Sequence, residues 1–173
     1  MHESLSAMAK SKKLSLNQLC VSLLSDGLNA KAQEPAFFED LKTLSLQLKK
    51  HFGASLCGTA LFGSYATGDA TSASDIDLLI VLDSGTPVER NLYKWWDDNV
   101  IWNDGATLNP HFVNIPSDAE QPGGLWLEVA TSGRILYENG SALTDLFKKI
   151  KGLLDEGRVR RYTSNGHSYW IWR

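Results

Sequence analysis

The stretch that decides the fold is LFGSYATGDATSASDIDLLIVLD, residues 61–83. Its final part, from Ile76 to Leu82, is an almost unbroken apolar run, which predicts a buried strand. Two aspartates, Asp75 and Asp77, stand at the start of that run. Because alternate side chains of a strand share a face, both carboxylates should point the same way, about 7 Å apart along the chain. Ile76 and Leu78 should then point into the core.

Neighbouring carboxylates need compensating charge. They repel each other, and burying either one without a partner costs several kcal/mol. Magnesium suits this demand, because it binds a few carboxylate oxygens, several waters and the oxygens of a substrate phosphate. Two such ions, roughly 4 Å apart, would stabilise the attacking and leaving oxygens of a phosphoryl transfer. Asp75 and Asp77 are therefore the candidate metal-binding and catalytic residues.

The Gly63-Ser64 turn ahead of the aspartates is a candidate phosphate site. Glycine lets the backbone approach a phosphate closely, and the Ser64 hydroxyl and neighbouring amides can donate hydrogen bonds to it. If residues 65–68 begin a helical turn, its N-terminus adds partial positive charge. Ser74 either contacts the nucleotide or caps the start of the strand. Strand, turn and carboxylate-bearing strand together predict a site for a nucleoside triphosphate, such as ATP, with magnesium.

The segments GSYATG and SASDIDLLIVLD resemble the signature of the DNA polymerase β-like nucleotidyltransferase superfamily, in particular its minimal nucleotidyltransferases. The family pattern of Gly-Ser, about ten residues and Asp-x-Asp falls on Gly63, Ser64, Asp75 and Asp77. The resemblance implies a palm-like α+β core and two catalytic magnesium ions held by the aspartates. It also implies transfer of a nucleoside monophosphate to an acceptor, with release of pyrophosphate.

The chain departs from the family pattern in two places. Thr67 stands in the turn where many relatives carry an arginine. Active relatives also carry a third carboxylate on a later strand, and the candidate segment here, LNPHFVNI, has His111 near that position. A neutral imidazole replaces a carboxylate poorly for magnesium, which favours oxygen ligands. Asp104, just before this segment, and Glu128, after it, are the alternative carboxylates.

Two functions follow as hypotheses. The first is an enzyme that binds a nucleoside triphosphate with magnesium and transfers the nucleotide to a protein, a transfer RNA end or a small molecule. The second is a regulatory module with a degraded metal site, acting as an antitoxin-like subunit or a nucleotide sensor. Its partner would be another protein or a second copy of the chain. A third possibility is a structural protein whose aspartates only cap local turns.

The composition fits one globular domain, because 173 residues with 43% hydrophobic content can enclose a core. A formal net charge of −3 excludes a globally basic nucleic-acid binder. Cys20 and Cys57 are too few for a disulfide framework and are expected as buried thiols in a reducing cytoplasm. No run approaches the roughly 20 apolar residues of a membrane helix, so we expect a cytoplasmic protein without membrane association.

The rest of the chain predicts an α+β domain, a small mixed sheet flanked by helices, over residues 14–157. It follows a flexible segment, residues 1–13. After it comes an Arg- and aromatic-rich tail, residues 158–173, that either packs on the domain or a partner, or stacks on bases and pairs with phosphates. Strands are expected at 55–62, 76–82, 107–115 and 134–138, and helices at 15–27, 35–52, 86–100, 125–130 and 141–156.

Overall fold

The protein is described by a computed structural model over residues 8–9, 14–21, 36–102, 105–164 and 167–173. The chain divides into two compact units, residues 1–40 and 41–173. In the first unit, residues 16–21 are helical. Ser15 Oγ accepts from the Gln18 amide at 3.2 Å, and Gln18 Oε1 accepts from the Ser15 amide at 2.9 Å. These reciprocal bonds form a capping box at the start of the helix that the sequence predicts over residues 15–27. The expected end of this helix, near residue 27, lies outside the described residues.

A four-stranded mixed sheet forms the centre of the second unit, in the order β3-β2-β1-β4. Its strands are β1 (Leu56–Phe62), β2 (Ile76–Leu82), β3 (Leu108–Asn114) and β4 (Arg134–Glu138). β1 is antiparallel to β2 and to β4, whereas β2 and β3 are parallel. Pro110 lies on the edge strand β3, where a residue without an N–H is tolerated.

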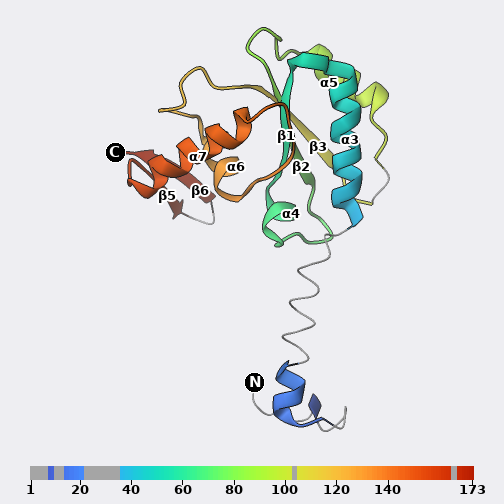
Figure 1. Cartoon of the computed structure of the whole chain (residues 1–173), viewed down its shortest axis with the longest axis vertical. Helices are drawn as coiled ribbons and strands as arrows, with labels where there is room; N and C mark the ends of the chain where they lie inside the picture. The colour runs from blue at the N-terminus through green and yellow to red at the C-terminus, as the bar shows by residue number, and fades with distance from the viewer. Residues whose placement is uncertain (1–7, 10–13, 22–35, 103–104, 165–166) are drawn as a thin grey trace. The chain divides into compact units, whose positions relative to one another are not determined.

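Helices cover both faces of this sheet, and Figure 1 shows α3 on one side and α6 and α7 on the other. The helices are α3 (Ala36–Phe52), α4 (Ser64–Thr67), α5 (Arg90–Asn99), α6 (Gly124–Ser132) and α7 (Ala142–Asp155), with a 3-10 turn at Gly53–Ser55. The predicted α+β class, a small mixed sheet flanked by helices, is confirmed.

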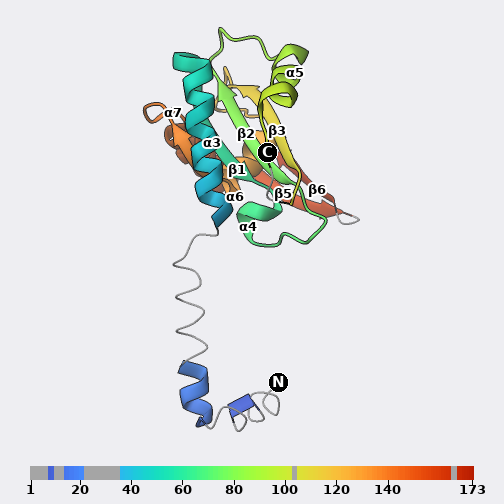
Figure 2. The same cartoon turned by 90° about the vertical axis from the view of Figure 1, so that its right-hand side faces the viewer.

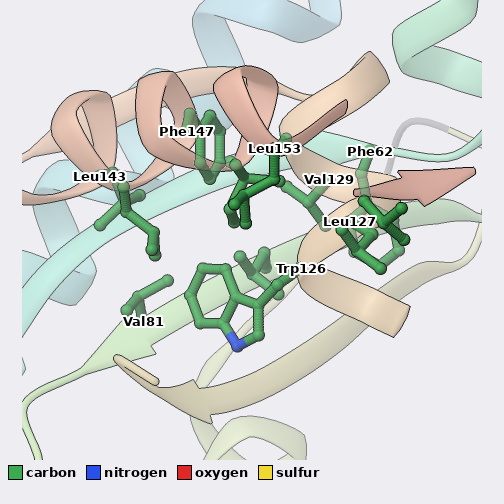
Figure 3. Close-up of a cluster of buried hydrophobic side chains, with 14 residues drawn as sticks. Phe62, Val81, Trp126, Leu127, Val129, Leu143, Phe147 and Leu153 are labelled. Atoms are coloured by element: carbon green, nitrogen blue, oxygen red, sulfur yellow. The ribbon is translucent and has the colours of Figure 1, made fainter. Parts of the chain in front are cut away.

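The larger part of the core lies between the sheet and helices α6 and α7. Alternate residues of β1 and β2 meet the apolar sides of the two helices there, and Figure 3 shows the cluster. Its central members are Phe62, Leu79, Val81, Trp126, Leu127, Val129, Leu143, Phe147, Ile150 and Leu153. Asp77 shares this face of β2 with Leu79 and Val81, because side chains two residues apart point the same way.

The opposite face of the sheet packs against α3 and α5. Ile76 and Leu78 are fully buried, as the strand pattern predicts. The Phe112 ring of β3 lies edge-to-face against Phe52 of α3 and Trp96 of α5, with ring centroids 6.1 Å apart in each pair. β2 is therefore covered on both faces, which explains its continuous apolar sequence.

The C-terminal tail forms a hairpin of β5 (Val159–Ser164) and β6 (His167–Trp172), an arrangement that our sequence interpretation did not include. Figure 2 shows the two strands side by side. Val159 is buried in the main cluster and Trp170 packs against it, so one face of the hairpin lies on the domain. Tyr162 and Tyr169 stack on each other on the other face and are exposed. The tail thus contacts the domain through Val159 and Trp170.

Three smaller expectations need correction or comment. The helix expected over residues 86–100 begins later than expected, because α5 starts at Arg90 and the Thr86 hydroxyl donates to Asp83 Oδ1 at 2.9 Å. Cys20 and Cys57 are free thiols, but both are partly exposed and not buried. Within the described ranges, no helix combines the length and the apolarity needed to cross a bilayer.

Candidate active site

The turn between β1 and α4 is built around Gly63. Its backbone has φ 71° and ψ −159°, a conformation that residues with a side chain rarely adopt. The Gly63 carbonyl accepts the amides of Ala66 and Thr67, at 3.1 and 3.3 Å, and so starts the short helix that the sequence predicts. No side chain caps the first turn of α4. The amide side of this turn is thus built from backbone alone.

Gly63 and Asp77 lie against each other. The β1–β2 register pairs Phe62 with Asp77, which brings the following glycine beside the carboxylate. A Cβ placed on Gly63 would lie 2.5 Å from Asp77 Oδ2, so no side chain fits there. The structure therefore brings together two parts of the candidate site that are separated by thirteen residues of loop and helix.

The paired aspartates stand at the open end of the buried strand. Asp77 is the second residue of β2, and its side chain is 26% exposed. Asp75 comes directly before β2 and is exposed. Because Ile76 and Leu78 anchor the strand in the core, the carboxylate of Asp77 is held in place by buried neighbours on both sides.

The neighbouring strand β3 contributes Asn109 and His111. Parallel pairing sets Asn109 beside Asp77. Asn109 Nδ2 donates to Asp77 Oδ1 at 3.3 Å, and His111 Nε2 lies 3.2 Å from the same oxygen. Asn109 Nδ2 and His111 Nε2 are 3.2 Å apart. The three side chains form a connected cluster, and the sequence-predicted third-strand position, His111, is part of it.

Asn109 is the residue of this cluster that sequence reasoning missed. The signal was present, because residues two apart on a strand share a face and Asn109 stands two residues before His111. The His111 ring also meets Phe62 edge-to-face, with centroids 4.9 Å apart. An aromatic side chain of β1 therefore fixes one side of the cluster.

The remaining sequence candidates lie elsewhere. Ser74 Oγ accepts the Thr71 amide at 2.9 Å, a bond within the loop before β2 that favours the capping alternative. The Thr67 hydroxyl donates to the Ser64 carbonyl at 3.2 Å, within α4. Glu128 Oε1 accepts from Arg161 at 2.9 Å, so this carboxylate is paired with the hairpin. Asp104 lies outside the described residues.

The residues at the mouth of β2 fit a divalent cation on the Gly63 side. Asp77 Oδ2 faces the turn where phosphates are expected, and two carboxylates with phosphate oxygens and waters are a donor set that magnesium accepts. Asp77 Oδ1, on the β3 side, is already engaged by Asn109 and His111. Over the part of the chain that the structure describes, no three His, Cys, Asp or Glu side chains gather as a metal cluster.

Residues 41–125 match the family model of the nucleotidyltransferase domain. This segment contains the Gly63-Ser64 turn, both aspartates and strand β3, so the recognition made from the signature is confirmed. A protein of Methanocaldococcus jannaschii, whose proposed activity is protein adenylyltransferase, is 29% identical over 111 residues. The aligned part covers 61% of this chain and 75% of that protein.

Solved structures with lower similarity come from toxin-antitoxin complexes. One was determined with AMP-PNP and matches with a TM-score of 0.42 and 18% identity, over 65% of this chain and 86% of the other. Another is the tri-AMPylated Shewanella oneidensis HEPN toxin in complex with an MNT antitoxin. It matches with a TM-score of 0.41 and 16% identity, over 70% of this chain and 89% of the other.

Proposed function

We propose that the protein, whose residues 41–125 match the family model of the nucleotidyltransferase domain, transfers a nucleoside monophosphate from a nucleoside triphosphate to an acceptor hydroxyl. A bond forms between the acceptor oxygen and the α-phosphorus, the bond between the α- and β-phosphates breaks, and pyrophosphate leaves. The hydroxyl proton passes to solvent. The observation that carries the proposal is the contact between Gly63 and Asp77, because it sets the backbone turn of Gly63 beside a carboxylate on the buried strand β2.

Each residue of the site has a role in this proposal. Asp75 and Asp77 would hold magnesium together with the triphosphate. The Ser64 hydroxyl and the uncapped first turn of α4 would donate to phosphate oxygens. Magnesium, when bound, supplies positive charge against the charge that develops on the phosphates. The buried strand β2 supplies the positioning, since its carboxylate does not have to move to meet the substrate.

A protein hydroxyl and ATP are the favoured acceptor and donor. The support is the similarity to the Methanocaldococcus jannaschii protein, whose proposed activity is transfer of adenylate to a protein. Transfer RNA ends and small molecules, the other acceptors considered from the sequence, have no comparable support. The exposed tyrosine pair of the C-terminal hairpin, Tyr162 and Tyr169, offers a surface on which a partner protein could dock.

The test is transfer of label from α-³²P-ATP to protein acceptors in the presence of magnesium. Asp77→Asn should lower the rate on the order of 10²-fold or more, because it removes charge from the transition state. Asp98→Asn is the matched control, since Asp98 is an exposed residue of α5. An undiminished rate of transfer by Asp77→Asn would contradict the proposal, as would an equal loss of rate in Asp98→Asn.

A regulatory module is the second candidate, favoured by the amide and imidazole that stand on β3 beside Asp77. Such a module would bind nucleotide without turnover and act through a partner protein or a second copy of the chain. Calorimetry with ATP separates the two functions. Binding that is unchanged by magnesium, with no pyrophosphate released, supports the module, whereas magnesium-dependent binding with pyrophosphate release excludes it.

A further inference from the structure

The two oxygens of the Asp77 carboxylate have different surroundings. Oδ2 faces the Gly63 turn, where a Cβ would lie only 2.5 Å away. Oδ1 faces β3 and is within hydrogen-bond distance of Asn109 Nδ2 and His111 Nε2. A carboxylate shared by two cations offers one oxygen to each of them. Here the oxygen on the β3 side is already engaged by groups of the protein itself.

The strand register shows why these groups occupy that place. β2 and β3 are parallel, with Asp77 opposite Asn109 and Leu79 opposite His111. Partner residues of adjacent strands point to the same face, so Asn109 and His111 project beside Asp77. A third carboxylate that completes a second cation site from β3 would have to stand at one of these two positions. The chain has an amide and an imidazole there.

The chemistry of the two side chains disfavours a magnesium ion. Magnesium takes oxygen ligands in near-ideal octahedral geometry, and it gives up its waters reluctantly. The Asn109 amide already directs its nitrogen to Asp77 Oδ1, and the imidazole offers nitrogen only. With His111 protonated on Nε2, both groups donate to Oδ1 and occupy the lone pairs that a second ion would require.

We propose that this site takes one divalent cation with its nucleotide, and that Asn109 and His111 stand in the place of the second. The cation lies on the Gly63 side, held by Asp75 and Asp77 with the phosphates. On the β3 side, the two N–H groups hold Asp77 Oδ1 in position where a metal would otherwise do so. This inference rests on the proposed nucleotide binding, and it changes the sequence expectation of two ions to one.

Counting bound manganese tests the inference directly. The full-length protein is mixed with Mn²⁺ and the α,β-methylene analogues of the four ribonucleoside triphosphates, and free Mn²⁺ is measured by electron paramagnetic resonance. We expect one Mn²⁺ per bound nucleotide. Two per nucleotide would overturn the inference while leaving the proposed function intact, and loss of the second ion in Asp104→Asn would then identify its ligand. If neither nucleotide nor metal binds, the proposed function itself fails.

Variants show whether the named residues exclude the second ion. Asn109→Asp and the double variant Asn109→Asp/His111→Asp should raise the count from one to two, because they restore carboxylate oxygens on the β3 side. Asn99→Asp is the control, since it adds the same charge on α5, against the opposite face of the sheet. Its count should remain one. A count of one in both β3 variants, with thermal unfolding unchanged, would overturn the assignment of these residues.

Discussion

The Gly63 backbone lies against the Asp77 carboxylate, at a distance that leaves no room for a side chain on residue 63. The contact joins the end of β1 to the start of β2, the two central strands of the sheet. Residue 63 must therefore be glycine for two reasons. Its backbone has a positive φ of 71°, and the Asp77 carboxylate occupies the space that a Cβ would fill.

Gly63→Ala should therefore lower both stability and nucleotide binding. The backbone conformation costs of order 1–3 kcal/mol for a residue with a side chain, and displacement of Asp77 adds to that cost. Urea unfolding measures the stability, and titration with Mg²⁺ and the α,β-methylene ATP analogue measures the binding. Loss of binding is expected to accompany the loss of stability.

Gly68→Ala separates the two effects. Gly68 also has a positive φ, 85°, but a Cβ there meets nothing within 4 Å. We expect Gly68→Ala to lower the free energy of unfolding by about 1 kcal/mol, the usual left-handed penalty, and to leave binding unchanged. Equal losses in the two variants would show that the contact with Asp77 is unimportant.

A second prediction concerns the hydroxyls of Ser45 and Thr59, which are hydrogen-bonded at 2.7 Å in the core between α3 and β1. Ser45 also donates to the Leu41 carbonyl at 2.7 Å. Ser45→Ala should cost about 1–3 kcal/mol of unfolding free energy, because it leaves the buried Thr59 hydroxyl without this partner. Thr59→Val should cost less, since Ser45 keeps its bond to the helix.

The double variant completes the cycle for this pair. Ser45→Ala/Thr59→Val removes both polar groups, so it should be more stable than the sum of the single effects predicts, by about 0.5–3 kcal/mol. Urea unfolding of the four proteins gives the coupling. Strict additivity would contradict a direct interaction between the two hydroxyls.

A third prediction concerns pH and Asp83, just beyond β2. Hydrogen bonds from the Thr86 hydroxyl, then from Ser55 and from backbone amides, hold the pKa of Asp83 below its ordinary value. A carboxyl whose pKa is lower in the folded state stabilises the fold above its unfolded pKa, about 3.9. That contribution is lost as the pH falls through the folded pKa.

Thr86→Val should raise the pKa of Asp83 toward its ordinary value, because it removes the first of these donors. The free energy of unfolding of this variant should then decrease less as the pH falls below about 4. Carboxyl carbon chemical shifts followed by NMR during an acid titration measure this pKa. Thr86→Ser keeps the hydroxyl and should titrate as the unchanged protein does. An unaltered pKa in Thr86→Val would contradict the assignment.

Local patterns predicted most of the elements. The apolar run of β2 gave its bounds, Ile76–Leu82, and Arg134–Glu138 was likewise found as a strand. Helix α3 was expected up to residue 52 because Gly53 follows a basic last turn. The hairpin at the C-terminus was missed, although Asn165-Gly166 between alternating residues is a sequence signal for a two-residue turn. The aromatic and basic composition of this segment is also typical of a binding surface, so composition alone does not indicate strand pairing.

The spacing of Gly63, Ser64, Asp75 and Asp77 was determined by the sequence alone, because a turn, a loop and a strand start are local features. The tertiary structure decided what stands on the other side of Asp77. Asn109 lies 32 residues further along the chain, and the parallel register that brings it to Oδ1 is set by packing on both faces of β2. No local pattern contains that register. Side-chain spacing along one strand therefore predicts the paired carboxylates, whereas only the folded sheet places an amide and an imidazole beside them.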